Sequence, residues 1–195
     1  MEKLKKQMSF LIEIEKLKNV FRQTLIYDKS RNENDAEHSW HMAMYAIILE
    51  EYAPKGTDIL KVIKMALIHD IIEIYAGDTF LYDEEMIKTK EKREKEAAKK
   101  IYSILPQQQG EEIKALWQEF EEKKTNEAIF CGILDRIQPI ILNYLTEGGT
   151  WKKYNIKKET ILQKGNIIFE EADERLKQYV LSIIDESIEK GYLLF

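Results

Sequence analysis

The chain has 195 residues, of which 30 are basic and 35 acidic, and its formal net charge is −5 at pH 7. Hydrophobic residues at 44% and charged residues at 33% are typical of a globular chain rather than a disordered one. Eight glycines and three prolines are too few for a collagen-like, linker-like or turn-rich all-β protein.

The hydrophobic pattern predicts one helix after another, because apolar residues recur at helical spacing rather than in strict alternation. In chain order, we expect a helix over about 3–19, a polar loop over 20–36, and helices over about 37–52, 57–74, 83–105, 109–123, 126–146 and 158–190, the last with a break at Gly165. Glycine or proline lies between most of these segments. No repeat, linker or domain boundary is evident, so the sequence predicts a single all-α domain over 1–195 with about seven or more helices.

The sequence also indicates where the protein works. Cys131 is the only cysteine and cannot form an internal disulfide, so the chain needs no oxidising compartment. Charged residues interrupt the apolar residues of the N-terminus, and uncharged runs fall short of the ~20 residues that span a bilayer. We therefore expect a cytoplasmic protein without a membrane partner. Its acidic balance argues against binding a nucleic acid polymer but leaves small anionic substrates open.

All three histidines, His38, His41 and His69, lie within one 32-residue stretch. His69 is followed directly by Asp70, near the end of a predicted helix. Adjacent helical residues point about 100° apart, so both side chains can reach a point beside the helix between them. A metal ion can occupy such a point, with imidazole nitrogen and carboxylate oxygen as ligands at about 2 Å.

Two further residues complete a candidate ligand set. His38 begins the preceding helix, and an antiparallel arrangement of the two helices would bring it opposite His69. Asp135 is the only acid in the apolar segment FCGILDRIQPII, and a buried carboxylate there needs a partner. A metal ion would supply that partner, and so would Arg136 or a hydrogen-bond network.

The order His38, His69-Asp70, Asp135 is the pattern H…HD…D, and in this respect the sequence resembles the HD-domain superfamily of metal-dependent phosphohydrolases. The segments NDAEHSWHMAMYA, ALIHDIIEIYAGDT and ILDRIQPI carry the resemblance, together with LKNVFR upstream. They are similar to the compact bacterial branch related to 5′-deoxynucleotidases. The similarity runs from about residue 14 to 180.

The resemblance implies a helical bundle that binds one divalent cation through His38, His69, Asp70 and Asp135. Two carboxylates and two imidazoles leave coordination positions open for water and a phosphate oxygen. Nitrogen and oxygen ligands without a thiolate admit Mn, Co, Fe, Zn or Mg. The competing hypothesis is a non-catalytic helical protein in which the metal only stabilises the fold.

The resemblance also implies roles for three residues near the ligands. Glu73 matches an acid–base residue that orients water or protonates the leaving alkoxide, and Asp78 matches an acid near the sugar or the attacking water. Arg22 matches an arginine that contacts the substrate phosphate, for which a planar guanidinium is well suited. Without the resemblance, Glu73 and Arg22 would be interpreted as solvent-exposed charges.

The implied activity is removal of phosphate from (deoxy)nucleoside 5′-monophosphates or similar small phosphate esters. The residue after Arg22 is Gln23, where deoxyribose-selective nucleotidases commonly have tryptophan, and Thr79-Phe80-Leu81 replaces their proline-bearing segment. These differences keep another nucleotide or non-nucleotide phosphate open as the substrate. The resemblance also suggests a homodimer. His41 is interpreted either as support for the ligands or as a packed or surface histidine.

Overall fold

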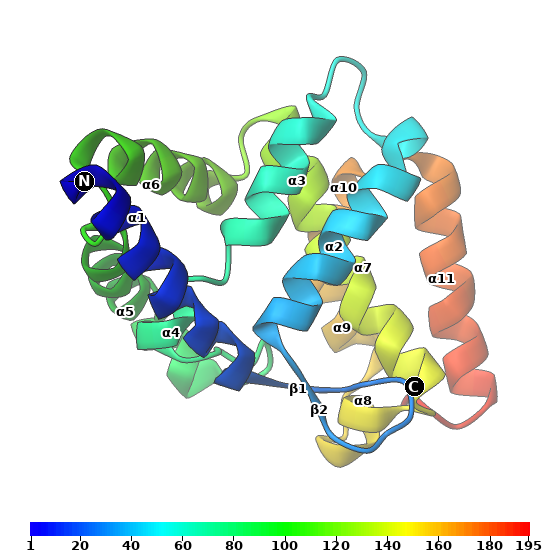
Figure 1. The fold of residues 1–195 in the computed structure, drawn as a ribbon. Coiled ribbons are helices and arrows are strands. Elements are labelled where there is room, and N and C mark those ends of the chain that lie inside the picture. Colours follow the sequence, from blue (N-terminus) through cyan, green and yellow to red (C-terminus); the bar gives the residue numbers. More distant parts are fainter.

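The computed structural model describes residues 1–195 as a helical bundle with one small hairpin (Figure 1). The α-helices are α1 Glu2–Glu13, α2 Asp35–Ile48, α3 Ile59–Ile68, α4 Glu73–Ala76, α5 Glu84–Tyr102, α6 Gln107–Glu122, α7 Asn126–Leu145, α8 Gly149–Lys153, α9 Lys158–Lys164, α10 Asn166–Glu171 and α11 Glu174–Glu189. Two 3₁₀ helices, η1 Ile14–Asn19 and η2 Glu50–Tyr52, and two strands, β1 Phe21–Leu25 and β2 Asn32–Asn34, complete the fold. The predicted all-α class is confirmed.

Helix α7 is the central element, and α2, α3, α6, α10 and α11 all pack against it (Figure 1). It is long and apolar enough to cross a membrane by length and composition, but 67% of its most apolar window is buried inside the fold, as in a core helix. Phe130 and Leu134 join the core shared with α2 and α3, whereas Ile133 and Ile137 join the core formed with α8 to α11. Asp135 therefore lies on the central helix of the molecule, which other helices surround.

The predicted loop over 20–36 is wrong in part, because its two ends pair as an antiparallel hairpin. Phe21 is paired with Asn34 and Leu25 with Asn32, and the Asn32 side chain also donates to the Arg22 carbonyl at 2.5 Å. These strands are too short and too polar to give an alternating hydrophobic pattern. The consequence is that Arg22 and Gln23 are held on a strand.

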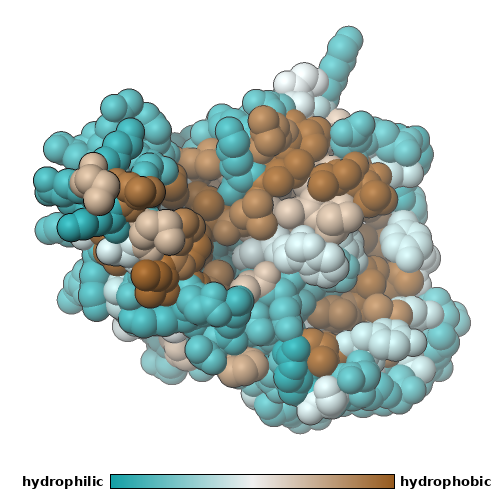
Figure 2. Space-filling model, viewed as in Figure 1, coloured by the Kyte–Doolittle hydropathy of each residue, from teal (hydrophilic) through white to brown (hydrophobic).

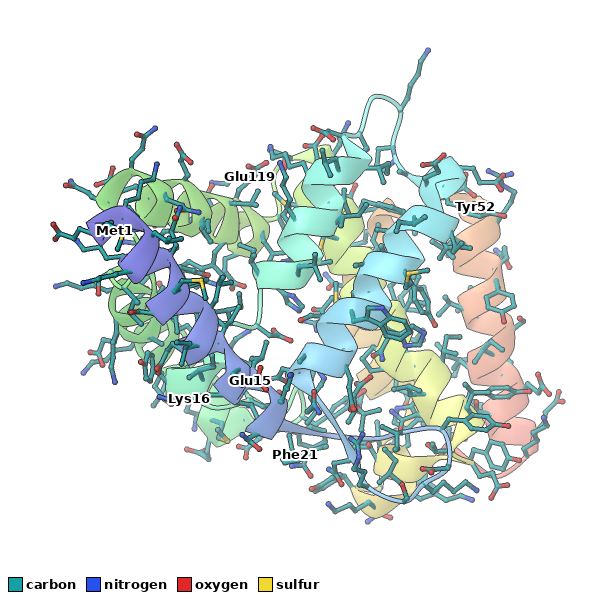
Figure 3. The ribbon with its side chains drawn as sticks, in the orientation of Figure 1. Met1, Glu15, Lys16, Phe21, Tyr52 and Glu119 are labelled. Carbon is teal, nitrogen blue, oxygen red and sulfur yellow. The ribbon has the colours of Figure 1, made fainter.

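Three predicted helices are interrupted. The helix predicted over 158–190 breaks at the expected Gly165 and again at 172–173, between α10 and α11. The N-terminal helix ends at Glu13 and tightens into η1 before it enters β1, a passage marked by Glu15, Lys16 and Phe21 in Figure 3. The helix predicted over 57–74 ends at Ile68, and the chain turns through 69–72 before α4 begins at Glu73. His69 and Asp70 therefore lie in a helix-terminal turn, in which His69 keeps helical dihedral angles.

The start of α2 is fixed by a capping box. The Asn34 side chain accepts from the Glu37 amide at 3.0 Å, and the Glu37 carboxylate accepts from the Asn34 amide at 3.2 Å. These bonds satisfy two amides that the helix leaves unpaired, and they place His38 on the first turn of α2.

We expect Asn34→Ala to lower the free energy of unfolding by about 1 kcal/mol, the usual effect of losing an N-cap side chain. The melting temperature should fall by about 2–4 °C for a domain of this size. Asn126→Ala is a matched control because Asn126 is exposed at the start of α7. Equal melting temperatures for the two variants would contradict a stabilising role for this cap.

Candidate metal centre and adjoining cavity

The structure brings the four predicted ligand residues together from α2, from the turn after α3 and from α7. His38 Nε2 lies 3.1 Å from Asp135 Oδ1, and His69 Nε2 lies 3.1 Å from Asp70 Oδ1. The diagonal distances, His38 Nε2 to Asp70 Oδ2 and His69 Nε2 to Asp135 Oδ1, are both 3.9 Å. One ring nitrogen of each histidine and one oxygen of Asp135 therefore gather around one buried point, and Asp70 borders it with a different oxygen toward each histidine.

Both histidines direct the same ring nitrogen toward this point. His38 Nδ1 is 3.0 Å from Gln138 Oε1, and His69 Nδ1 is 2.9 Å from the Ala66 carbonyl. Each of these oxygens accepts a hydrogen bond from Nδ1–H, so the favoured tautomer leaves Nε2 with its lone pair facing the cluster. His69 Nε2 is buried and makes no hydrogen bond. This donor set fits a divalent cation.

The charges of three of the four residues suit the same chemistry, whereas Asp70 and Asp135 raise the pKa of His69 above its ordinary value against the effect of burial. Burial opposes ionisation of Asp135, but Arg136 and His38 outweigh it and hold the pKa of Asp135 well below its ordinary value. Burial likewise opposes ionisation of Asp70, but His69 and Arg22 hold its pKa low. Burial lowers the pKa of His38 to about 4, so its ring is neutral at pH 7. Ionised carboxylates and a neutral imidazole are the forms in which these groups bind metals.

The sequence analysis left the partner of Asp135 open, and two of the alternatives coexist. Asp135 Oδ2 accepts a hydrogen bond from Arg136 Nη1 at 2.9 Å, whereas Oδ1 faces His38. One carboxylate oxygen is therefore occupied by the arginine and the other is turned toward the cluster.

A second group of acids lies beside the first. One carboxylate oxygen from each of Asp35, Glu73 and Asp78 lies within 4.8 Å of the others. Burial raises the pKa of all three, helped in each case by the charge of Asp70, and the pKa of Asp35 reaches about 8. Glu73 is only 7% exposed, so its interpretation as a solvent-exposed acid is wrong.

The Arg22 side chain is only 14% exposed, which excludes its interpretation as a surface charge. Its Nη1 is 3.0 Å from Asp70 Oδ2 and 3.6 Å from Asp35 Oδ1, and its Nε is 3.7 Å from Glu33 Oε2. The guanidinium therefore lies between the two acid groups, and its Nε makes no hydrogen bond.

Gln23 and His41, two residues singled out in the sequence, lie at the edge of the centre. Gln23 Oε1 accepts from the Tyr154 hydroxyl at 2.6 Å and from Lys153 Nζ at 3.2 Å. His41 lies outside the ligand cluster, and its Nδ1 is 3.4 Å from the amide nitrogen of Gln138, whose oxygen contacts His38. His41 therefore reaches the cluster through Gln138.

Three residues of the centre were missed from the sequence: Glu33, Asp35 and Gln138. Asp35 lies three residues before His38, and Gln138 lies three residues after Asp135, so each shares a helical face with a predicted ligand. This helical spacing could have predicted both residues from the sequence. No sequence pattern predicts Glu33, because it reaches Gln138 Nε2 at 2.6 Å only through the pairing of β2.

The centre opens into a cavity of about 350 Å³, a size that suits a small ligand. His69, Asp70 and Asp135 line one part of it. Further lining residues come from β1, the 78–82 loop, α5, the end of α6, and α7 to α9. A small molecule in this cavity would contact the candidate ligands directly.

One cavity residue predicts a measurable pH dependence. Burial raises the pKa of Glu94 from its ordinary 4.5 to about 7, although Lys90 opposes the shift. Between these values the folded protein holds a proton that the unfolded chain releases, so the free energy of unfolding falls as the pH rises. We expect the Glu94→Gln variant to lose this part of the pH dependence of the free energy of unfolding. Urea denaturation of EDTA-treated protein at about pH 5 and pH 7.5 measures it, and equal pH dependence in both proteins would contradict it.

The fold and the centre define a class of protein. A family model described as HD domain matches residues 14–177, and the chain belongs to this family. Among named relatives, the 5′-deoxynucleotidase HDDC2 of Dictyostelium discoideum is 36% identical over 117 residues, covering 57% of this chain and 62% of the relative. The 5′-deoxynucleotidase HDDC2 of Homo sapiens is 30% identical over 135 residues, covering 69% of this chain and 65% of the relative. The chain thus aligns with less than two thirds of either relative.

Solved structures share the fold. A predicted metal-dependent phosphohydrolase from Magnetospirillum magnetotacticum MS-1 is 46% identical, with a TM-score of 0.91 over 99% of this chain and 96% of its own. The protein PH0347 of Pyrococcus horikoshii OT3 is 24% identical, with a TM-score of 0.62 over 94% of this chain and 99% of its own. The likeness to PH0347 supports the fold alone. The Magnetospirillum protein also has the identical residue at nearly half of the positions.

Proposed function

We propose that the protein is a metal-dependent phosphohydrolase that removes phosphate from nucleoside 5′-monophosphates or similar small phosphate esters. The observation that carries the proposal is the convergence of His38, His69, Asp70 and Asp135 at the wall of a ligand-sized cavity. The names of the HDDC2 relatives and of the Magnetospirillum protein support the same chemistry.

We propose that these four residues hold one divalent cation. When bound, the cation would lower the pKa of a coordinated water and neutralise phosphate oxygens. The donors are nitrogen and oxygen only, so Mn, Co, Fe, Zn and Mg all remain candidates.

Other residues of the centre have distinct tasks in this proposal. The Arg22 guanidinium donates hydrogen bonds to the substrate phosphate and offsets its charge. Burial raises the pKa of Glu73 well above its ordinary value, so its carboxyl group holds a proton that it can pass to the leaving alkoxide. Asp78 lines the cavity, where its carboxyl oxygens accept hydrogen bonds from the sugar or from the attacking water.

In this proposal, Gln23 and the 78–82 loop contact the substrate sugar, since both line the cavity. Gln23 is held by Tyr154 and Lys153, which makes this corner polar and hydrogen-bonded. This observation favours testing substrates other than deoxynucleotides, including other nucleotides and non-nucleotide phosphate esters.

Phosphate release from a panel of ribo- and deoxyribonucleoside 5′-monophosphates tests the proposal. The assay is run with EDTA and with added Mn²⁺, Co²⁺ or Mg²⁺. We expect turnover of at least one member only when metal is present. No metal-dependent turnover of any phosphate ester would refute the assignment.

We further propose that the chain works as one domain in the cytoplasm, on small molecules rather than on nucleic acid polymers, and as a homodimer. An exposed apolar surface over α1, α2 and α3 supports the dimer (Figure 2). Its residues are Leu4, Met8, Leu11, Ile12, Trp40, Met44, Ile47, Ile48, Leu60 and Leu67. Light scattering after size-exclusion chromatography measures the mass, and a monomer at micromolar concentration would contradict the dimer.

A further inference from the structure

Three cations from three separate elements line the cavity beside the candidate metal ligands. Lys90 comes from α5, Lys123 follows α6, and Arg136 comes from α7. Arg136 contacts the outer oxygen of Asp135 at 2.9 Å, so this cationic wall begins next to the cluster. Arg22, by contrast, is already surrounded by Asp70, Asp35 and Glu33.

Lys123 is the least satisfied member of the wall. No carboxylate oxygen lies within 4.0 Å of its Nζ, which donates to the Phe120 carbonyl at 2.5 Å and lies over the Phe120 ring. Burial lowers the pKa of Lys123 to about 8. A partly buried ammonium without a carboxylate is costly, and an anionic ligand would remove that cost.

The fold makes specific room for this lysine. A Cβ atom at Gly132 of α7 would lie 2.7 Å from Lys123 Cε and 2.9 Å from Cδ. Glycine inside a helix costs roughly 0.5–1 kcal/mol relative to alanine, and here it lets the Lys123 stem cross α7 one turn before Asp135. Lys123 is therefore held against the helix that carries Arg136, not left free on the surface.

Acids face part of the wall, and Glu94 and Glu121 raise the pKa of Lys90 against the effect of burial. Lys90 Nζ is 3.5 Å from Glu94, but burial raises the pKa of Glu94 to about 7. Glu121 also lines the cavity and is exposed, and Asp135 is directed to the metal cluster. The charge of Arg136 opposes protonation of both Lys90 and Lys123, so the three cations are within electrostatic reach of one another, although Glu94 and Glu121 raise the pKa of Lys90 overall. Lys164 of α9 adds a further cation to the lining.

We infer that Lys90, Lys123 and Arg136 form a second anion subsite, and that the preferred substrate carries a second phosphate group besides the scissile one. The inference rests on the proposed function, since it takes the metal cluster as the site of the scissile phosphate. A planar guanidinium flanked by two ammonium groups suits phosphate, which accepts several charge-assisted hydrogen bonds at once. The cavity volume accommodates a small bisphosphorylated ester.

Lys123→Met tests the inference, with Lys124→Met as its control. Lys124 is the next residue, is 76% exposed and pairs with Glu122 at the surface. The substrates are the 5′-monophosphate, the 5′-diphosphate and the 3′,5′-bisphosphate of one nucleoside, and the last two distinguish a linked from a separate second phosphate. We expect the metal-loaded wild type to prefer a doubly phosphorylated substrate. Lys123→Met should lower that preference, as a ratio of kcat/KM values, by about tenfold or more, and Lys124→Met should not.

A wild type that prefers the monophosphate, or a preference that Lys123→Met leaves intact, would overturn the subsite. A second measurement needs no turnover: titration of the metal-loaded protein with pyrophosphate and with orthophosphate. We expect wild type to bind pyrophosphate more tightly, and Lys123→Met to remove most of the difference without lowering the melting temperature. Absence of turnover with this binding pattern intact would refute the proposed function alone. Equal binding of both anions by wild type would refute the subsite alone.

Discussion

Glu73→Gln is expected to lower kcat by about 10²- to 10⁴-fold, the usual contribution of a positioned acid or base. Glu73 lies in the cavity wall beside Asp70, Asp35 and Asp78, and burial in this acidic surrounding raises its pKa well above its ordinary value. Glutamine retains the shape of the side chain but cannot give up a proton to a leaving alkoxide. The change should therefore appear in kcat rather than in folding.

Metal content and melting temperature separate this role from others. Both should hold in Glu73→Gln, because the substitution removes a carboxyl group crowded by other acids and removes no proposed ligand. Glu96→Gln is the control, since Glu96 is exposed on α5. Full turnover in Glu73→Gln would exclude the acid role, and loss of metal would instead make Glu73 a ligand. A wild type that holds metal but hydrolyses no ester would favour a structural metal site.

His69→Ala is expected to abolish metal binding and to reduce turnover on the order of 10³-fold or more, because a bound metal would supply both the activated water and charge neutralisation. His69 Nε2 is a buried candidate ligand atom that makes no hydrogen bond. Removing the His69 side chain leaves the cluster with one imidazole. The bound metal per chain, measured by mass spectrometry, should fall from about one to near zero. EDTA should lower the melting temperature of wild type but not of His69→Ala.

His41→Ala is the matched control for this experiment. His41 lies in the same stretch of sequence but contacts the cluster only through Gln138. Its replacement should leave the metal content near one per chain. Loss of metal in His41→Ala, or retention of metal in His69→Ala, would contradict the proposed ligand set.

The helices that carry the candidate ligands could be located from sequence because each lies in a strongly patterned segment, whereas the ligand set itself was implied by the resemblance to the HD-domain superfamily. His38 and Asp135 lie on long periodic helices, and His69-Asp70 ends a third, so their convergence needs only the packing of α2, α3 and α7. The hairpin that holds Arg22 has five-residue and three-residue strands, which are too short to carry a periodic signal. Its position was therefore not predictable from local pattern.

Tertiary contacts explain the remaining differences. Leu4, Met8, Leu11 and Ile12 of α1 recur at helical spacing, yet they are exposed, and Phe10 provides the buried contact of this helix. In the charged helix α5, Lys95 is exposed and pairs with Glu91, but Lys90 lines the cavity. Which charges of a helix face a cavity depends on neighbouring elements, and one sequence does not give that information.

Anomalous diffraction from a crystal soaked with Mn²⁺ and orthophosphate tests the central claim most directly. We predict a single anomalous peak at about 2.0–2.3 Å from Nε2 of His38, Nε2 of His69 and one oxygen each of Asp70 and Asp135. The phosphate should lie in the cavity on the side of Arg22. A peak among Asp35, Glu73 and Asp78 instead, or no peak at all, would contradict the account.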